Sequence, residues 1–188
     1  QVIEITDSVP HPEDFEARTD REAAEQALDH MDIEPGQSML GYDVDVAFLG
    51  TCTNGRVTDF AEAAKILEGH TVDEDVRALA VPGSETVREE CEARGIDETF
   101  INAGFQWRRA GCSMCLAMND DSLEGDEVCA SSSNRNFIGR QGSKEGRTVL
   151  MSPAMVAAAA VEGEVADARE YLGDDPTGGA SGVEEAAD

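Results

Sequence analysis

The chain has 188 residues, a length that fits one globular domain or one domain with a tail. Hydrophobic residues make up 40% of it, too large a share for a chain that is disordered throughout. Forty acidic residues against 14 basic ones give a formal net charge of −26, which repels nucleic-acid phosphates and anionic lipids. No apolar run approaches the roughly 20 residues that a membrane-spanning helix needs. The composition therefore disfavours nucleic acid and membranes as partners.

The acidic residues are spread along the whole chain, and such a charge destabilises a compact fold by self-repulsion. In 1 M salt the Debye length falls to about 3 Å, which screens the repulsion. We therefore interpret the charge as that of a halophile protein rather than as a docking surface for a basic partner. Five cysteines and no opening signal segment favour a reducing cytoplasm. Because residue 1 is Gln1 and not Met, we expect a piece of a longer protein.

Residues 1–42 are predicted to form a lead-in with one helix, from Thr19 to Met31, and to belong to the same domain as the following residues. After the lead-in, hydrophobic patterning predicts strands that alternate with helices. Such an alternation is typical of a parallel sheet with helices on its faces. The expected elements are strand 44–49, helix 58–67, strand 76–81, helix 84–94 and strand 99–102.

Residues 104–126 are predicted to be mostly loop or short helix, and two further strands are expected at 128–131 and 147–151. Pro153 occupies a favoured first-turn position at the start of an Ala-rich helix. The predicted fold class is α/β: a three-layer domain over residues 43–170, with a mostly parallel sheet and helices on both faces. Residues 171–188 are expected to be a disordered acidic tail, since they offer little to bury.

Three loops with polar residues follow predicted strands: 50–56 (GTCTNGR), 111–115 (GCSMC) and 132–142 (SSNRNFIGRQG). In a parallel sheet the carboxyl ends of the strands share one edge, and ligands bind outside that edge. We therefore expect the three loops, with three cysteines and several arginines, to converge there.

Cys112 and Cys115 form a C-x-x-C pair, a spacing shared by zinc sites, redox dithiols and iron–sulfur clusters. Cys52 is distant in sequence, but we expect it to be near them in space. A structural zinc site needs a fourth Cys or His, so three thiolates favour a cluster with one iron left open as a Lewis acid. A redox dithiol or an inert pair stays open as the alternative. Cys91 and Cys129 are expected to be core side chains.

Arg135 and Arg140 lie in the third loop, beside Asn134 and other amide side chains. Planar guanidinium groups bind carboxylates through two parallel hydrogen bonds. Two such groups beside a Lewis-acidic iron suit a substrate with several carboxylates. The alternative is that each arginine pairs with one of the forty acidic side chains.

Three motifs resemble the aconitase superfamily in their order along the chain: residues 50–56, 103–119 (AGFQWRRAGCSMCLAMN) and 131–142. Residues 107–119 and 146–163 (GRTVLMSPAMVAAAAVEG) are more narrowly similar to the large subunits of 3-isopropylmalate dehydratase, also called isopropylmalate isomerase. The resemblance extends from about residue 44 to residue 167, and it implies the third, cluster-bearing domain of that family.

The resemblance implies a [4Fe–4S] cluster whose ligands are Cys52, Cys112 and Cys115. It places Asn134 against the cluster and assigns both arginines of the third loop to substrate carboxylates. The implied reaction is the reversible removal and re-addition of water that interconverts 2-isopropylmalate and 3-isopropylmalate in leucine biosynthesis.

The chain also departs from the family pattern. Members have a long N-terminal region with His and acidic active-site residues, and a serine base on a swivelling domain that a separate small subunit supplies in this branch. We therefore assign no general base here and expect the small subunit and a hydroxy di- or tricarboxylate as partners. This portion alone is expected to be inactive. The alternatives are an aconitase, homoaconitase or citramalate-type hydro-lyase, or a non-enzymatic iron–sulfur or zinc sensor or docking module.

Overall fold

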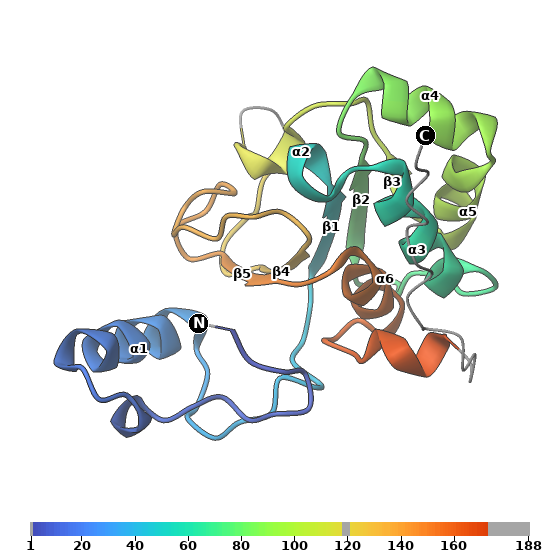
Figure 1. Ribbon diagram of the computed structural model, residues 1–188. Helices are drawn as coiled ribbons and strands as arrows, with labels where there is room; N and C mark the ends of the chain where they lie inside the picture. The colour runs from blue at the N-terminus through green and yellow to red at the C-terminus, as the bar shows by residue number, and fades with distance from the viewer. Residues whose placement is uncertain (1, 118–120, 173–188) are drawn as a thin grey trace, which may run out of the picture.

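A five-stranded sheet lies at the centre of the computed structural model, which describes residues 2–117 and 121–172 (Figure 1). All four strand pairs are parallel, and the strand order is β3-β2-β1-β4-β5. The strands are β1 (Val46–Gly50), β2 (Arg77–Val81), β3 (Gln106–Trp107), β4 (Val128–Ser131) and β5 (Arg147–Leu150). The predicted α/β class with a parallel sheet is therefore confirmed.

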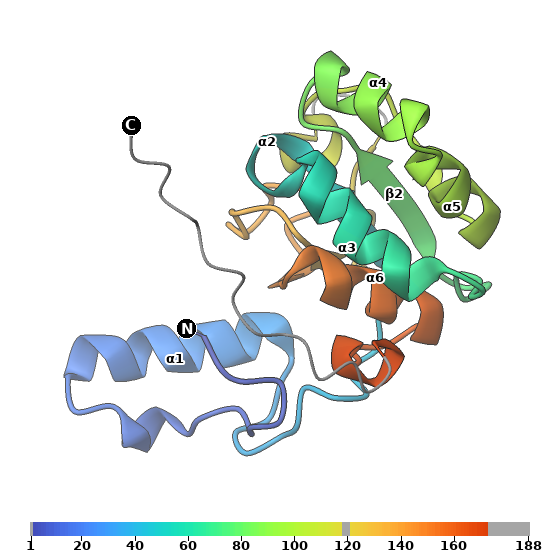
Figure 2. The same cartoon turned by 45° about the vertical axis from the view of Figure 1, so that its right-hand side comes forward.

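Helices cover one face of the sheet (Figure 2). Apolar side chains at alternate strand positions, such as Ala47 and Leu49, pack against Phe60, Phe100 and Val156 from three different helices, as expected for a period-two strand face. Phe60 and Phe100 meet edge to face with their ring centroids 5.5 Å apart. The helices on this side are α3 (Val57–Leu67), α4 (Glu85–Ala93), α5 (Ile96–Ala103) and α6 (Pro153–Glu162).

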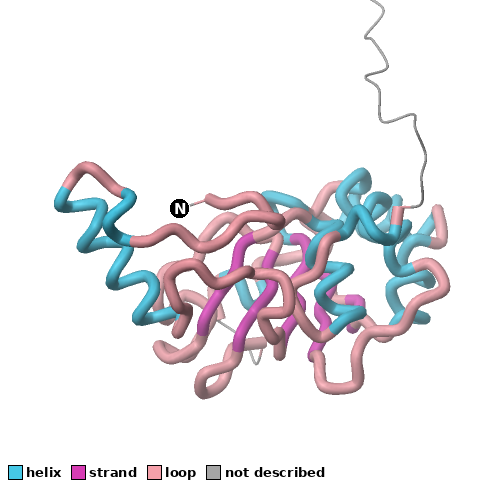
Figure 3. The backbone as a smooth tube through the Cα atoms, turned by 90° about the horizontal axis from the view of Figure 1, so that it is seen from below, coloured by secondary structure: helices cyan, strands magenta, loops and turns pink. Residues whose placement is uncertain are grey.

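The opposite face is covered by irregular segments instead of long helices. Val46 and Phe48 point away from the first core and pack with Met114, Leu123 and the buried Cys129. The short 3-10 helix η2 (Ser113–Cys115) belongs to this cover, and Figure 3 shows the loops that run past the strands. The third layer of the predicted three-layer domain is therefore made largely of the loops that carry the motifs. These loops lack the amphipathic repeat that indicates a helix in a sequence.

The lead-in packs against the sheet domain through a third apolar cluster, in which Val9 and Met39 meet Ala130 and Val165. Its elements are η1 (Pro12–Asp14) and α1 (Arg18–Met31), which lie at the periphery beyond β5 (Figure 1). The Tyr42 hydroxyl donates to the carbonyl oxygen at the end of α1 at 2.6 Å.

The predicted strand at 99–102 is wrong, because these residues lie inside α5. Thr99, Phe100 and Ile101 have high strand propensity, which suggested the strand. Helical spacing nevertheless places the buried Phe100 and Ala103 on one side, with Ile101 half-exposed on the other. Gly95 and Gly104 bracket the helix in left-handed conformations, with φ +70° and +111°. The third strand is β3, two residues long and four residues farther along the chain.

The other predicted helices and strands are found within two residues of their expected boundaries. Three short elements were not predicted: η1, the turn α2 (Thr51–Asn54) directly after β1, and η3 (Ala168–Tyr171) near the end of the described chain. Tyr171, assigned above to the tail, ends the 3-10 helix η3, whereas the tail prediction for 173–188 lies outside the described residues. In the part of the chain that the structure describes, no helix has the length and apolar character to cross a membrane.

Candidate functional site

The carboxyl ends of β1 and β4 meet at the point where the strand order changes direction. β2 and β3 extend the sheet on one side of β1, and β4 and β5 extend it on the other. A parallel sheet binds its ligands at such a switch point. Ser132, directly after β4, accepts from Gly50 N through Oγ (2.8 Å) and from Asn54 Nδ2 through its carbonyl oxygen (2.6 Å). The first and third motif loops are therefore joined at this edge.

Cys52 lies on the single turn α2 and is exposed. The turn starts with an unusual backbone: Gly50 has φ +112° and Thr51, with a branched side chain, has φ +67°. Non-glycine residues in this region store strain, and such strain concentrates at functional sites. Thr51 is buried, and its hydroxyl oxygen has no hydrogen-bond partner among the described residues. The first motif therefore presents the exposed Cys52 on a turn whose backbone is strained at Thr51.

The C-x-x-C pair brackets η2, since Cys112 is its N-cap and Cys115 its last residue. Between them, Met114 is fully buried and packs against the sheet in the second core. Cys112 is exposed and Cys115 is 8% exposed. Ser113 and Ala117 have positive φ angles of 44° and 46°. The second motif thus repeats the pattern of the first, with strained non-glycine residues beside the cysteines.

Arg140 joins the third motif loop to the second. Its Nε donates to the Cys115 carbonyl oxygen at 2.8 Å. Neither Arg140 nor Arg135 forms an ion pair with any carboxylate of the described residues, so the structure does not support the alternative that they neutralise surface acids. Arg135 and Asn134 are exposed in the same loop. The arginines therefore keep donors for a ligand at this edge.

The sequence predicts that three loops meet at one edge, and the hydrogen bonds of Ser132 and Arg140 join all three. Among residues 2–117 and 121–172, no three or more His, Cys, Asp or Glu side chains are grouped as ligands of one metal ion. A cluster of several irons takes one thiolate per iron, so its ligands need not converge on a single point. The donors fit a cluster, because thiolates are its usual ligands and Cys52 and Cys112 are exposed. The ligand set itself stays a prediction.

Cys91 and Cys129 are fully buried, as the sequence predicts for core side chains. Burial raises the pKa of the Cys91 thiol from its ordinary 9.0 to about 11, and burial raises the pKa of Cys129 as well. A raised pKa in the folded state stabilises the fold below about pH 9, and this contribution is lost as the pH rises through about 11.

Cys91→Ala should therefore flatten the loss of stability between pH 9 and 11. The measurement is the free energy of unfolding from urea denaturation at intervals of half a pH unit, in the presence of a reducing agent. If the free energy of unfolding of the variant falls as steeply as that of the wild type over this range, ionisation of Cys91 does not cause the loss of stability.

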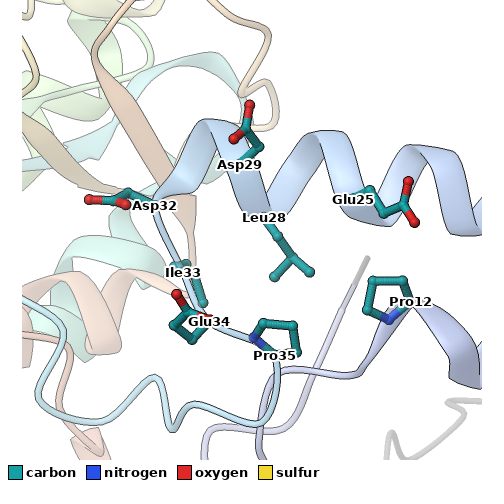
Figure 4. A pocket seen from close by; sticks show the side chains of 8 residues that line it. All are labelled: Pro12, Glu25, Leu28, Asp29, Asp32, Ile33, Glu34 and Pro35. Atoms are coloured by element: carbon teal, nitrogen blue, oxygen red, sulfur yellow. The ribbon is translucent and has the colours of Figure 1, made fainter.

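Two surface hollows lie away from the three loops. One of about 380 Å³ is lined by residues 67–71 with Thr99, Asn102 and Ala103. The other, of about 330 Å³, lies within the lead-in, between α1 and the segments that flank it, and combines acidic with apolar side chains (Figure 4). Its lining residues are Pro12, Glu25, Leu28, Asp29, Asp32, Ile33, Glu34 and Pro35. Neither hollow contains a cysteine or an arginine of the motifs, so the candidate site is the open edge of the sheet.

Sequence reasoning named the loops but missed the hydrogen bonds that join them. Ser132 is part of the third motif, but its role as the acceptor for two groups of the first motif depends on strand register. Its position directly after β4 is the only sequence signal for that role. The hydrogen bond from Arg140 to a backbone carbonyl has no sequence signal, because any residue supplies a carbonyl oxygen.

Comparison with known proteins gives consistent matches. The model of the aconitase family (aconitate hydratase) matches residues 1–163. The chain is 64% identical over 170 residues to a 3-isopropylmalate dehydratase large subunit of Halorubrum lacusprofundi, and 62% identical over 174 residues to one of Salinibacter ruber. The identity is 61% over 170 residues for a protein of the same name from Natronomonas pharaonis. These alignments cover 90–92% of the chain and 36–37% of each relative, so the chain spans just over a third of their length.

Proposed function

The chain belongs to the aconitase family, and from this membership we propose that it is the cluster-bearing portion of the large subunit of a 3-isopropylmalate dehydratase. Relatives of that name are 56–64% identical over nine-tenths of the chain. The observation that carries the proposal is the joining of the three motif loops at the sheet's switch point through Ser132 and Arg140.

In the proposed site Cys52, Cys112 and Cys115 hold a [4Fe–4S] cluster, and Asn134 lies against it. Three thiolates leave one iron without a protein ligand, and that iron supplies Lewis acidity toward a hydroxyl or carboxylate oxygen of the substrate. The two short turns, α2 and η2, present the cysteines from separate loops.

Arg135 and Arg140 are proposed to bind the substrate's carboxylates. Arg140 already uses Nε for the Cys115 carbonyl, which orients the guanidinium plane and leaves its two terminal nitrogens for a carboxylate. Arg135 is exposed and has the full guanidinium available. Fixing a dicarboxylate at two points aligns the carbon–hydrogen and carbon–oxygen bonds that must break.

The proposed reaction balances without a redox partner. A proton leaves one carbon and a hydroxyl leaves its neighbour, a carbon–carbon double bond forms, and water then adds with the opposite regiochemistry. We assign no general base within this chain. We propose that a small subunit provides it, since the relatives are named large subunits, and that the assembly works in a reducing cytoplasm. All five cysteines of the chain are free thiols, which is consistent with that compartment.

The test begins with the chain itself, reconstituted without oxygen with ferrous iron and sulfide. We expect a brown protein with equal amounts of bound iron and sulfide. The complete large subunit with its small subunit should then convert 3-isopropylmalate faster than citrate, followed by the ultraviolet absorbance of the unsaturated acid. Stoichiometric zinc without sulfide would support a sensor or docking module, and preferred turnover of citrate would support an aconitase.

The net charge of −26 predicts that salt stabilises the chain. Several similar proteins come from halophiles, which is consistent with the interpretation of the acidic composition. We expect the melting temperature to rise by several degrees between about 0.1 M and 1 M KCl, where the Debye length shrinks from about 10 Å to about 3 Å. Thermal unfolding followed by circular dichroism checks this, and a melting temperature independent of salt contradicts it.

A further inference from the structure

The turn that carries the C-x-x-C pair has an unfavourable backbone and needs an outside support. Ser113, between the two cysteines, has φ +44°, a left-handed conformation that serine adopts only with compensation. Cys115 N donates to the Cys112 carbonyl at 2.9 Å, so the conformation of Ser113 sets the separation of the two cysteines. A residue that holds Ser113 therefore positions both thiols.

Asp121 is that support. Its Oδ2 accepts from the Ser113 hydroxyl at 2.6 Å, and its Oδ1 accepts from Arg108 Nη2 at 2.5 Å. Asp121 is 7% exposed, so its carboxylate lies inside the protein, whereas the Arg108 side chain that pairs with it is 40% exposed. The guanidinium of Arg108 also compensates the charge of the buried carboxylate.

Arg108 connects this support to the sheet. It directly follows β3, and its backbone N donates to the Ala80 carbonyl of β2 at 2.9 Å. A continuous path thus runs from the parallel sheet through Arg108 and Asp121 to Ser113. Met114 fixes the underside of the same turn in the second core. Two kinds of contact therefore hold the turn: the packing of Met114 in the second core, and the hydrogen bond to Asp121, which is paired with Arg108.

We propose that Asp121 and Arg108 are positioning residues for the C-x-x-C pair, which they hold in the arrangement required for cluster binding. The link to a cluster rests on the proposed function, whereas the link to the cysteines rests on the hydrogen bonds alone. Residues that orient metal ligands typically change metal affinity by 10–100-fold when they are replaced.

The experiment uses the full chain without iron and measures the alkylation rate of each cysteine by mass spectrometry. In the wild type, Cys52 and Cys112 should react fast and Cys115 slowly, because it is 8% exposed. Asp121→Asn should raise the rate at Cys115 roughly tenfold relative to Cys52, since a charge-assisted hydrogen bond is lost. The matched control is Asp167→Asn, a carboxylate bonded by Arg169 far from the turn in sequence, which should leave the rate unchanged.

Cys91 and Cys129 are fully buried and report whether the fold survives. If they become reactive in Asp121→Asn, Ser113→Ala decides the matter, because it removes only the hydroxyl donor. An unchanged rate at Cys115 in a folded Asp121→Asn chain, or in Ser113→Ala, overturns the proposal. In Ser113→Gly the backbone no longer needs support, so adding Asp121→Asn should have little further effect.

A second measurement separates this proposal from the proposed function. After anaerobic reconstitution, Asp121→Asn should retain iron at least tenfold less tightly than the wild type when both are challenged with a chelator. A wild-type chain that binds no iron contradicts the proposed function, and the alkylation rates then still decide whether Asp121 positions the turn. Equal retention by both chains overturns the positioning role in cluster binding.

Discussion

Cys52→Ser should prevent the chain from assembling an iron–sulfur cluster, with a loss of bound iron and sulfide of at least about tenfold. The thiolate is the ligand that iron–sulfur clusters use, and a serine hydroxyl is a much weaker acid and a harder donor. Cys52 stands alone on α2, whereas the other two proposed ligands share one turn. Its loss therefore removes the only thiol that the first motif loop contributes. Visible absorbance and iron and sulfide analysis after anaerobic reconstitution provide the measurement.

Cys91→Ala is the matched control for this prediction. Cys91 is fully buried on α4 and packs in the helical core, so its replacement should cost some stability but leave iron and sulfide binding intact. If Cys52→Ser takes up as much iron as the wild type, the ligand set is wrong. If Cys91→Ala also fails to bind iron while remaining folded, the loss of iron in Cys52→Ser is no evidence that Cys52 is a cluster ligand.

The sheet could be predicted because its strands and helices have separate, clear patterns. Residues 46–49 are all apolar and predict the first strand, and the amphipathic pattern of α3 predicts the first helix after it. The alternation of strands with helices then indicates that the strands pair in parallel. The one strand that was predicted at the wrong place is β3, the shortest of the sheet. Its two residues, Gln106 and Trp107, pair with β2 but carry no alternating pattern, whereas Thr99 to Asn102 has strand propensity that helical packing overrides.

The candidate site could be predicted only as a meeting of loops. The parallel-sheet rule brings residues 50–56, 111–115 and 132–142 to one edge, and the hydrogen bonds of Ser132 and Arg140 join them there. The left-handed conformations of Thr51 and Ser113 could not be predicted, because nothing local to either residue favours them. The hydrogen bond from the Ser113 hydroxyl to Asp121 is a contact between side chains eight positions apart, which the local sequence does not indicate.

Gly50→Ala should destabilise the fold by at least about 3 kcal/mol, a large share of the roughly 5–15 kcal/mol that stabilises a typical domain. Gly50 ends β1 with φ +112°, which an alanine avoids. An added Cβ would also lie 2.1 Å from the Val81 carbonyl oxygen and 3.0 Å from Phe60 Cζ. Val81 is the β-sheet partner of Gly50, so neither backbone can move without disturbing the β1–β2 register.

Gly69→Ala separates the two causes in this prediction. Gly69 has φ +80°, but an added Cβ would meet no atom within 4 Å, so only the backbone cost of about 1–2 kcal/mol applies. Urea denaturation of both variants, compared through their midpoints at equal slope, measures the difference. Because Gly50 directly precedes α2, Gly50→Ala should also lower iron binding through Cys52, whereas Gly69→Ala should not. If the two variants are destabilised equally, the contact between β2 and the added Cβ at Gly50 contributes nothing. The close approach of β2 would then not explain why a glycine is needed where the first motif loop begins.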